Sequence, residues 1–191
     1  DMALTVGPLP PILRRTNDDG EFWTGAAPAT LDWRGRRLEG RVIFEYLRRN
    51  NWNRFTRKFE ANWRNFNGLY LLTSDGADFY MHSHERSGGS DLTGRLVGMA
   101  TWHAPAPITD IEFSITDKVK GGGESQFHWP TAWHVRFSHG GRRYVATLKM
   151  REKKLFAWWR TGGFRMAIVD GEITSPEEPS RKVTGWAELL I

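Results

Sequence analysis

Residues 121–137, GGGESQFHWPTAWHVRF, contain the pattern that decides the fold. After a glycine-rich turn the segment alternates as a β-strand does, so Trp133 and every second residue after it point to one face. Pro130 cannot donate a hydrogen bond to a neighbouring strand, which predicts that it begins the strand or lies in a bulge. Large indoles are costly to leave in water, so Trp129 and Trp133 are predicted to line a pocket or to fill the end of a core.

Strand patterns recur along most of the chain at the spacing of β-hairpins. The Asp-Gly pair at residues 75–76 and the Gly-Gly pair at residues 140–141 are typical of tight hairpin turns. The predicted strands cover residues 31–33, 37–47, 69–73, 77–84, 95–102, 108–116, 133–138, 143–150, 155–159, 164–169 and 183–191. Strands joined in this way predict an antiparallel barrel or sandwich.

The composition fits one domain with a core built from large aromatic side chains. Hydrophobic residues make up 39% of the 191 residues and aromatic residues 13%, with 10 Trp and 11 Phe. The absence of cysteine excludes disulfides and thiolate chemistry, while the net charge of +5 favours anionic partners. No apolar run approaches the roughly 20 residues of a membrane-spanning helix. We therefore expect a soluble protein, cytoplasmic or peripheral to a membrane, with the periplasm as an alternative.

Two segments depart from the strand pattern. Prolines and a charged turn predict an extended leader over residues 1–28, followed by a single barrel domain over residues 29–191. Within that domain, residues 48–66 carry aromatic side chains at the spacing of one helical face, which predicts a helical lid packed over one end of the barrel. Because its other faces carry arginine and lysine, contact with an anionic membrane surface is a further function for the same lid.

Glu45 is the first candidate for catalysis. It shares a predicted strand face with Ile43 and Leu47, and apolar surroundings favour the neutral form of a carboxyl group. A neutral acid in an apolar cavity can protonate an alkene or polarise a carbonyl. The alternative is that Glu45 faces solvent or pairs with Arg41 or Arg48.

Histidines and tryptophans on other predicted strands supply further candidates. Tyr80, His82 and His84 share one strand face, and a His-x-His pair can bind zinc if a third ligand converges. Since no second ligand motif accompanies the pair, we predict no metal site and expect these histidines to form hydrogen bonds at a strand end. The tryptophans predict either core packing or an aromatic wall that stabilises positive charge. They are Trp129, Trp133, Trp158, Trp159 and Trp186.

Several other chemistries lack their motifs. The chain has no Gly-x-Ser-x-Gly elbow, which argues against an α/β-hydrolase. The glycines at residues 121–123 do not form a phosphate-binding loop, because no helix is predicted to follow them. The arginines are scattered and no nucleic-acid-binding motif occurs, so we expect no nucleic-acid partner.

Four motifs occur in the order typical of one known family. Besides the aromatic-Pro-x-x-Trp strand, they are RLEGRVIFEY at residues 37–46, FNGLYLLTSDGADFYMHSHE at 66–85 and GWAEL at 185–189. Over residues 34–191 the chain thereby resembles the carotenoid 1,2-hydratase/AttH-like family of lipocalin-related β-barrels. The resemblance implies a chemistry that needs no metal or cofactor. It also implies that Glu45 stands where the family's hydratases place the Asp that donates a proton to a double bond.

These features together predict a lipocalin-like antiparallel barrel of about 8–10 strands, with a short helical lid and room for an elongated apolar molecule. The favoured hypothesis is an enzyme, a hydratase, isomerase or cyclase of isoprenoid or polyketide metabolism that uses Glu45 as acid and aromatic walls to fold its substrate. The alternative is a non-catalytic carrier or accessory subunit that binds a pigment or lipid. A second copy of the chain or a partner domain is a candidate to complete the barrel. The predicted substrate-binding residues are Tyr46, Tyr80, His82, Trp129, Trp133, Trp158 and Trp186.

Overall fold

The structure is a computed structural model of residues 1–191. It describes residues 2–8, 13–17, 20–50, 64–85, 97–100, 106–120, 128–152, 156–157 and 164–190. All regular secondary structure in these ranges is β-strand. The chain divides into two compact units, residues 1–57 and residues 58–191, and each is described by itself.

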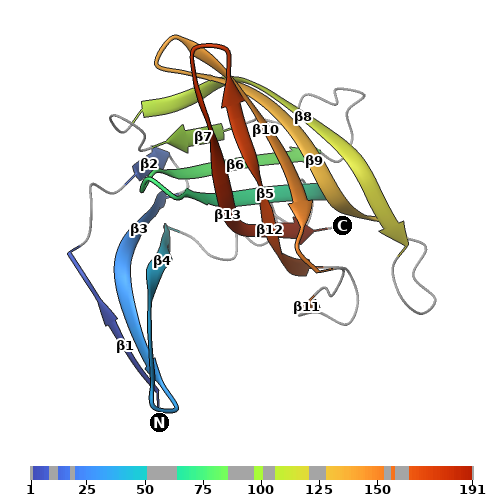
Figure 1. Cartoon of the computed structure of the whole chain (residues 1–191). Helices are drawn as coiled ribbons and strands as arrows, with labels where there is room; N and C mark the ends of the chain where they lie inside the picture. The colour runs from blue at the N-terminus through green and yellow to red at the C-terminus, as the bar shows by residue number, and fades with distance from the viewer. Residues whose placement is uncertain are drawn as a thin grey trace. The chain divides into compact units, whose positions relative to one another are not determined.

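The first unit is a four-stranded antiparallel sheet built on one long hairpin (Figure 1). Strands β3 (Gly20–Trp33) and β4 (Arg36–Arg49) pair along their full length. The turn between them, residues 34–35, has positive φ at both positions, as a two-residue hairpin turn requires. On the other edge of β3 lie β2 (Leu13–Asn17) near its start and β1 (Met2–Val6) near its end.

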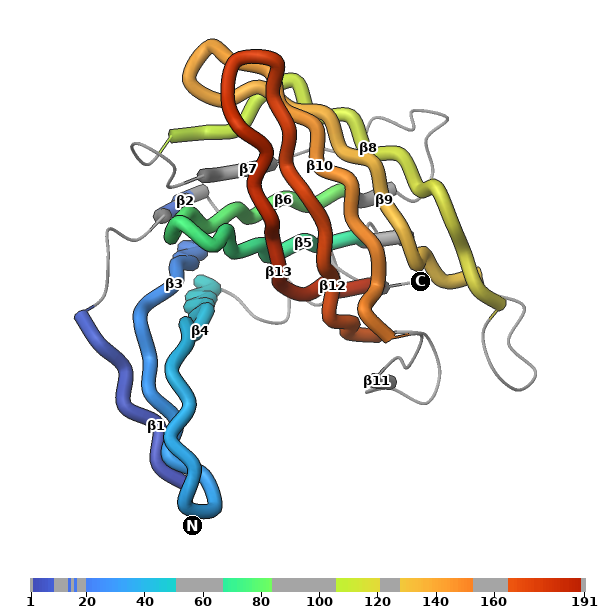
Figure 2. The backbone as a smooth tube through the Cα atoms, in the orientation of Figure 1, coloured from blue at the N-terminus to red at the C-terminus, as the bar shows by residue number. Residues whose placement is uncertain are grey.

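The second unit is an antiparallel barrel made from the strands that follow. They are β5 (Arg64–Thr73), β6 (Asp78–Glu85), β7 (Val97–Ala100), β8 (Ala106–Lys120), β9 (His128–His139), β10 (Arg142–Met150), β11 (Phe156–Ala157), β12 (Phe164–Ser175) and β13 (Glu178–Leu190). Neighbours run in the order β10, β9, β8, β7, β6, β5, β13, β12, and the pairing of β10 with β12 closes the ring. Strand β11 adds to the edge of β12 beyond this pairing. Figure 2 traces the backbone round the ring.

The two ends of the barrel differ in their connections. Tight turns follow β5, β9 and β12, which run in the same direction, so these three turns lie together at what we call the hairpin end. At the opposite end β5, β9 and β12 begin and β13 finishes. The Asp-Gly and Gly-Gly turns predicted from the sequence are confirmed, with positive φ at Gly76, Gly140 and Gly141.

Ion pairs link neighbouring strands and turns at the hairpin end. The Glu178 carboxylate pairs with Arg142 and with Arg181, whose Nε lies 2.8 Å from Asp75 Oδ2 in the neighbouring turn. The Tyr144 hydroxyl donates to Glu178 Oε1 at 3.4 Å. Burial raises the pKa of Tyr144 and the adjacent Glu178 carboxylate raises it further, so this phenol stays a neutral donor.

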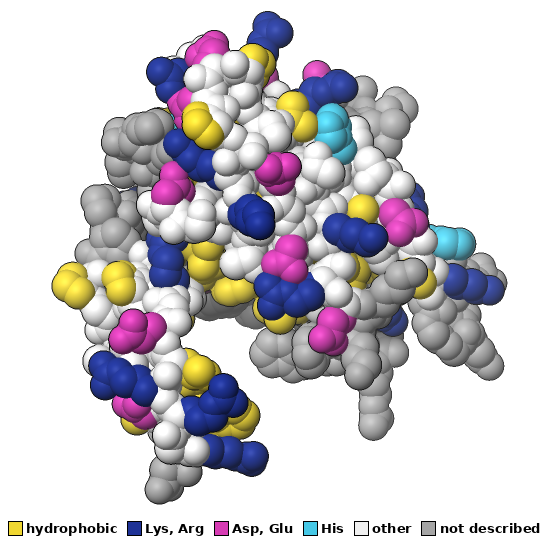
Figure 3. All heavy atoms as spheres, in the orientation of Figure 1, with side chains coloured by type: hydrophobic (Ala, Val, Ile, Leu, Met, Phe, Trp, Pro, Cys, Tyr) yellow, Lys and Arg dark blue, Asp and Glu magenta, His cyan; other side chains and the backbone are white. Residues whose placement is uncertain are grey.

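The inner face of the barrel is packed with apolar side chains. Strand residues alternate between this face and the outside, as the period of two requires. The largest fully buried side chains are Trp129, Trp133, Tyr144, Phe79, Phe137, Leu69, Leu71, Met81, Leu148, Ile173, Leu189 and Val135. On the visible outer surface, acidic and basic side chains are interspersed (Figure 3). The lipocalin-like barrel predicted from the sequence is therefore confirmed.

Two details of the prediction change. Both described ends of segment 48–66 are strand, the end of β4 and the start of β5, so the predicted helical lid is not seen; residues 51–63 lie outside the described residues. Residues 37–47, predicted as a barrel strand, instead lie in β4 and pair with β3 in the first sheet. Within the predicted leader, residues 2–6, 13–17 and 20–28 are paired strand, and the assignment of residues 1–28 to an extended leader stays a prediction. The assignment of residues 29–191 to one domain stays a prediction.

Candidate functional site

The barrel divides the predicted site residues between its two faces. Trp129 and Trp133 belong to the apolar cluster of the inner face. Tyr80 and Trp186 are both opposite Tyr70, which alternates with the inner-face leucines of β5 and therefore points outward. The structure thus does not bring the predicted aromatic set together in a single site.

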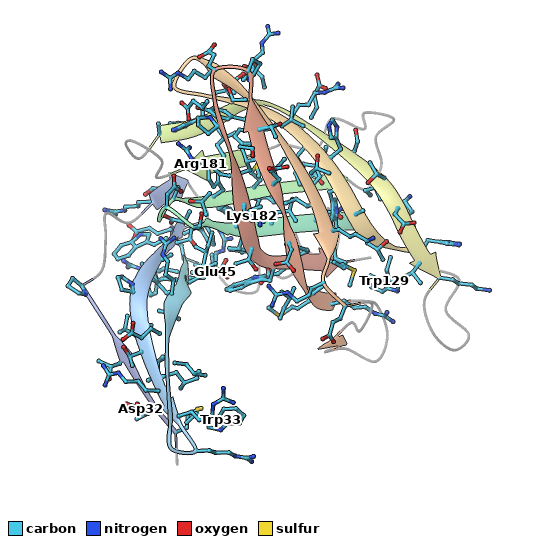
Figure 4. The ribbon with its side chains drawn as sticks, in the orientation of Figure 1. Asp32, Trp33, Glu45, Trp129, Arg181 and Lys182 are labelled. Atoms are coloured by element: carbon cyan, nitrogen blue, oxygen red, sulfur yellow. The ribbon has the colours of Figure 1, made fainter. Side chains whose placement is uncertain are left out.

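Trp129 lies near the start of β9, at the end of the barrel opposite the hairpins, and Figure 4 shows it far from Arg181. Its side chain is buried, with 1% of its surface exposed. The Arg165 guanidinium carbon stands 4.1 Å from the centre of its ring, a cation–π contact. Arg165 pairs with Leu189 in the β12–β13 register, which places both residues on the inner face. An aromatic surface and a cation therefore meet at this end of the barrel.

The electrostatics of this pair are unusual for a barrel core. Burial lowers the pKa of the Arg165 guanidinium, because an apolar environment penalises its charged form. Among the described residues, no carboxylate forms an ion pair with Arg165. The buried Trp129 Nε1 also has no hydrogen-bond partner there. Two adjacent donors thus lack an acceptor among the described residues.

Trp133 lies deeper on the same face and is fully buried. It pairs with Leu148 of β10, and its Nε1 donates to Asn67 Oδ1 of β5 at 3.3 Å. Its N–H is therefore satisfied within the protein. The full burial of Trp133 and its internal hydrogen bond fit both alternatives, packing in the core and a place in an aromatic wall.

A second aromatic group covers the outer face of β5, β6 and β13. The Tyr70 ring lies 4.7 Å from Tyr80 and 5.1 Å from Trp186 between ring centres. His82 Nδ1 lies 3.0 Å from the Tyr80 hydroxyl, within hydrogen-bond distance. Tyr70, Tyr80 and His82 are all buried although they point away from the barrel core. The hydrogen bond expected for His82 is therefore present, with Tyr80.

The remaining predicted residues lie elsewhere or outside the described chain. Glu45 is exposed on β4 (Figure 4), although Thr24, its partner on β3, is buried. The apolar enclosure that the neutral-acid hypothesis needs is not seen around Glu45. Tyr46 is also exposed, with its ring 5.2 Å from that of Trp23. Trp158 lies outside the described residues.

The described parts of the chain contain no cluster of three or more His, Asp or Glu side chains arranged to hold a metal ion. They also contain no helix of the length and apolarity that crossing a membrane requires.

Arg165 and Asn67 are the site residues that the sequence reasoning missed. Arg165 precedes Ala167 and Val169 in a strand that alternates with period two, and this spacing places its side chain on their face. An arginine in register with apolar inward residues was thus a usable signal. Asn67 offered none, because its partner is 66 residues away in the sequence.

No protein-family model matches the chain, and no curated protein sequence matches it. Among solved structures, a protein from Nitrosomonas europaea provisionally named AttH superposes with a TM-score of 0.63 at 10% identity. It covers 97% of this chain, which spans 59% of that protein. The chain has the AttH-like fold.

A second structure shares this fold. Kievitone hydratase from Nectria haematococca superposes with a TM-score of 0.51 at 10% identity, over 90% of this chain and 53% of its own. The chain therefore spans a little more than half the length of either AttH-like structure. The fold agrees with the family that the sequence motifs resemble.

Proposed function

We propose that this AttH-like barrel binds an elongated, mostly apolar molecule of the isoprenoid or polyketide type and acts on it as a hydratase. The observation that carries the proposal is the aromatic inner face, with Trp129 near one end of the closed ring and Trp133 deeper inside. Apolar and aromatic walls with few polar groups are typical of sites for small apolar ligands. The fold shared with kievitone hydratase supports addition of water as the reaction class.

Hydration of a carbon–carbon double bond needs a proton donor and a water molecule as nucleophile. Glu45 stays the proposed acid, and its support is the strand motif that resembles the hydratase family. Its exposed position on β4 means that the carboxyl group would need a bound substrate or a partner domain to shield it from water.

A carrier is the second candidate function, and the exposure of Glu45 favours it. A carrier needs only the apolar inner face and no acid. In either case the membrane contact of segment 48–66 and the assembly with a second copy or a partner domain remain predictions. Binding to anionic vesicles by the full chain, compared with a variant lacking the aromatic side chains of that segment, tests the membrane contact.

The first experiment is to express the protein in a host rich in polyenes and lipids and to identify co-purifying molecules by mass and absorption spectra. A bound polyene or isoprenoid would support the ligand class and supply a substrate for turnover assays. Protein that is free of ligand, and that binds none of a panel of such molecules, would refute both functions.

Glu45→Gln then separates the enzyme from the carrier, with Glu39→Gln, exposed on the same strand, as the matched control. We expect Glu45→Gln to retain ligand binding and to lose most hydration, on the order of 100-fold or more for a general acid. Glu39→Gln should keep both. Binding without any turnover by the wild-type protein would instead support the carrier.

A further inference from the structure

The end of the barrel opposite the hairpins holds a cation that the proposed chemistry does not use. Arg165 belongs to β12, and its register with Leu189 places it on the inner face among core residues. The side chain is half-buried and lies against Trp129, whose ring centre is 4.1 Å from the guanidinium carbon. A charged group on an apolar inner face is costly unless it is paired.

The Trp129 face compensates only part of that cost. A cation–π contact leaves the guanidinium N–H groups, up to five donors, without acceptors of their own. Within the described chain, the Arg165 guanidinium has no hydrogen-bond acceptor and no ion-pair partner. Trp129 adds an independent observation, because its Nε1 is buried and also lacks a partner among these residues.

Other arginines of the barrel pair with carboxylates. Arg151 pairs with Asp170 through two hydrogen bonds of 2.6 Å on the outer face. Arg136 pairs with Glu112 at 3.1 Å, also where both side chains are exposed. Arg165 differs from them in facing inward and in lying beside an indole N–H that has no partner in the described part of the chain.

We propose that Arg165 and the Trp129 N–H form a subsite for an anionic oxygen, such as a carboxylate, at the head of the apolar ligand. The inference rests on the proposed function, because it assumes that the barrel takes such a ligand. Guanidinium groups bind carboxylates with two parallel hydrogen bonds, and an indole N–H supplies a further donor. The apolar chain of the ligand then lies against the aromatic surface at this end of the barrel, beyond the two donors.

The same pair disfavours a carbocation at this position. A guanidinium repels a developing positive charge, and it already occupies one face of the Trp129 ring. The subsite therefore selects amphipathic acids over uncharged hydrocarbons of the same length.

cis-Parinarate, a fluorescent polyene carboxylate, and its methyl ester test the subsite directly. Both molecules carry the same apolar chain, and only the acid carries a charge. We expect the full-length protein to bind the acid about 10- to 100-fold more tightly than the ester at neutral pH, as charge-assisted hydrogen bonds allow. Raising the salt concentration should reduce the difference in affinity between the acid and the ester.

Two variants assign this preference to the two donors. Arg165→Gln should reduce the acid-to-ester preference to within about threefold, and Trp129→Phe, which keeps a ring but removes the N–H, should reduce it partly. Arg143→Gln removes an exposed arginine from β10 and should leave the preference unchanged. Circular dichroism and thermal unfolding of each variant show whether it is folded.

The outcomes separate the subsite from the proposed function. Equal binding of acid and ester by the wild-type protein would overturn the subsite and leave the apolar-ligand barrel standing. So would a folded Arg165→Gln variant that keeps the preference. Failure of both molecules to bind would overturn the ligand-binding proposal itself, and with it the subsite. The wild-type comparison decides the matter even if Arg165→Gln fails to fold.

Discussion

Trp133→Ala tests whether the inner face of the barrel is packed as a core. Trp133 is fully buried, and its Nε1 donates to Asn67 at 3.3 Å. Truncating a buried tryptophan to alanine costs about 3–5 kcal/mol. The upper half of that range is expected here, because a closed ring of paired strands cannot collapse easily around the cavity. The lost hydrogen bond to Asn67 adds to it, about 1 kcal/mol.

Guanidinium unfolding, followed by circular dichroism and extrapolated to water, measures this loss in the free energy of unfolding. Ile168→Ala is the control in the same barrel, because Ile168 is 47% exposed on the outer face of β12. It should change the stability by less than about 0.5 kcal/mol. Trp133→Phe keeps most of the packing and loses the N–H, so its cost should fall between the two.

A loss below about 1 kcal/mol for Trp133→Ala would refute the reasoning. It would mean that the indole borders a solvent-filled space rather than a packed core. The same result would strengthen the case for a roomy ligand cavity. A loss of the expected size would restrict the ligand to the end of the barrel near Trp129.

Two further predictions concern residues of the strands that surround this core. Hydrogen bonds from Arg151 lower the pKa of Asp170, so the carboxylate stabilises the folded state above its unfolded pKa of about 4, and this contribution is lost as the pH falls through the lower folded-state pKa. Asp170→Asn should lower the free energy of unfolding by less than about 1 kcal/mol at pH 7, because the ion pair with Arg151 is exposed. This difference from the wild-type protein should disappear in acid, and a difference that does not vary with pH would contradict the prediction. A Cβ added at Gly185 would overlap the Tyr70 carbonyl group, so Gly185→Ala should destabilise the barrel by about 1–3 kcal/mol in a thermal unfolding assay. Gly40→Ala, where an added Cβ meets nothing within 4 Å, is its control, and equal unfolding temperatures for the two variants would refute the close approach.

Local signals were enough for the strands and their turns. The alternation after Pro130 predicted β9, and the glycine turns predicted the hairpins joining β5 to β6 and β9 to β10. The helical spacing in residues 48–66 did not lead to a described helix, since both of its described ends pair as strands. The aromatic residues between positions 51 and 63, which make up most of that spacing, lie outside the described residues.

The candidate site was less predictable than the fold. Trp129 and Trp133 were correctly expected to be buried in a core or pocket, because large indoles leave water wherever a fold allows it. For Glu45 the strand pattern left apolar surroundings and exposure to solvent both open, and the side chain is exposed, because burial depends on what covers a strand face and not on its alternation alone. The same limit applies to Tyr80 and His82, which are buried on the outer face.

The sequence by itself determined the all-β class, the turns and the excess of aromatic side chains, because these depend on alternation and turn chemistry within a few residues. Only the tertiary structure decided the closure of the ring, in which β10 pairs with β12 across a register no local pattern encodes. That closure defines an inside and an outside, and so it separates Trp129 from Trp186. It also turns Arg165 from one arginine among many into a cation that faces the core.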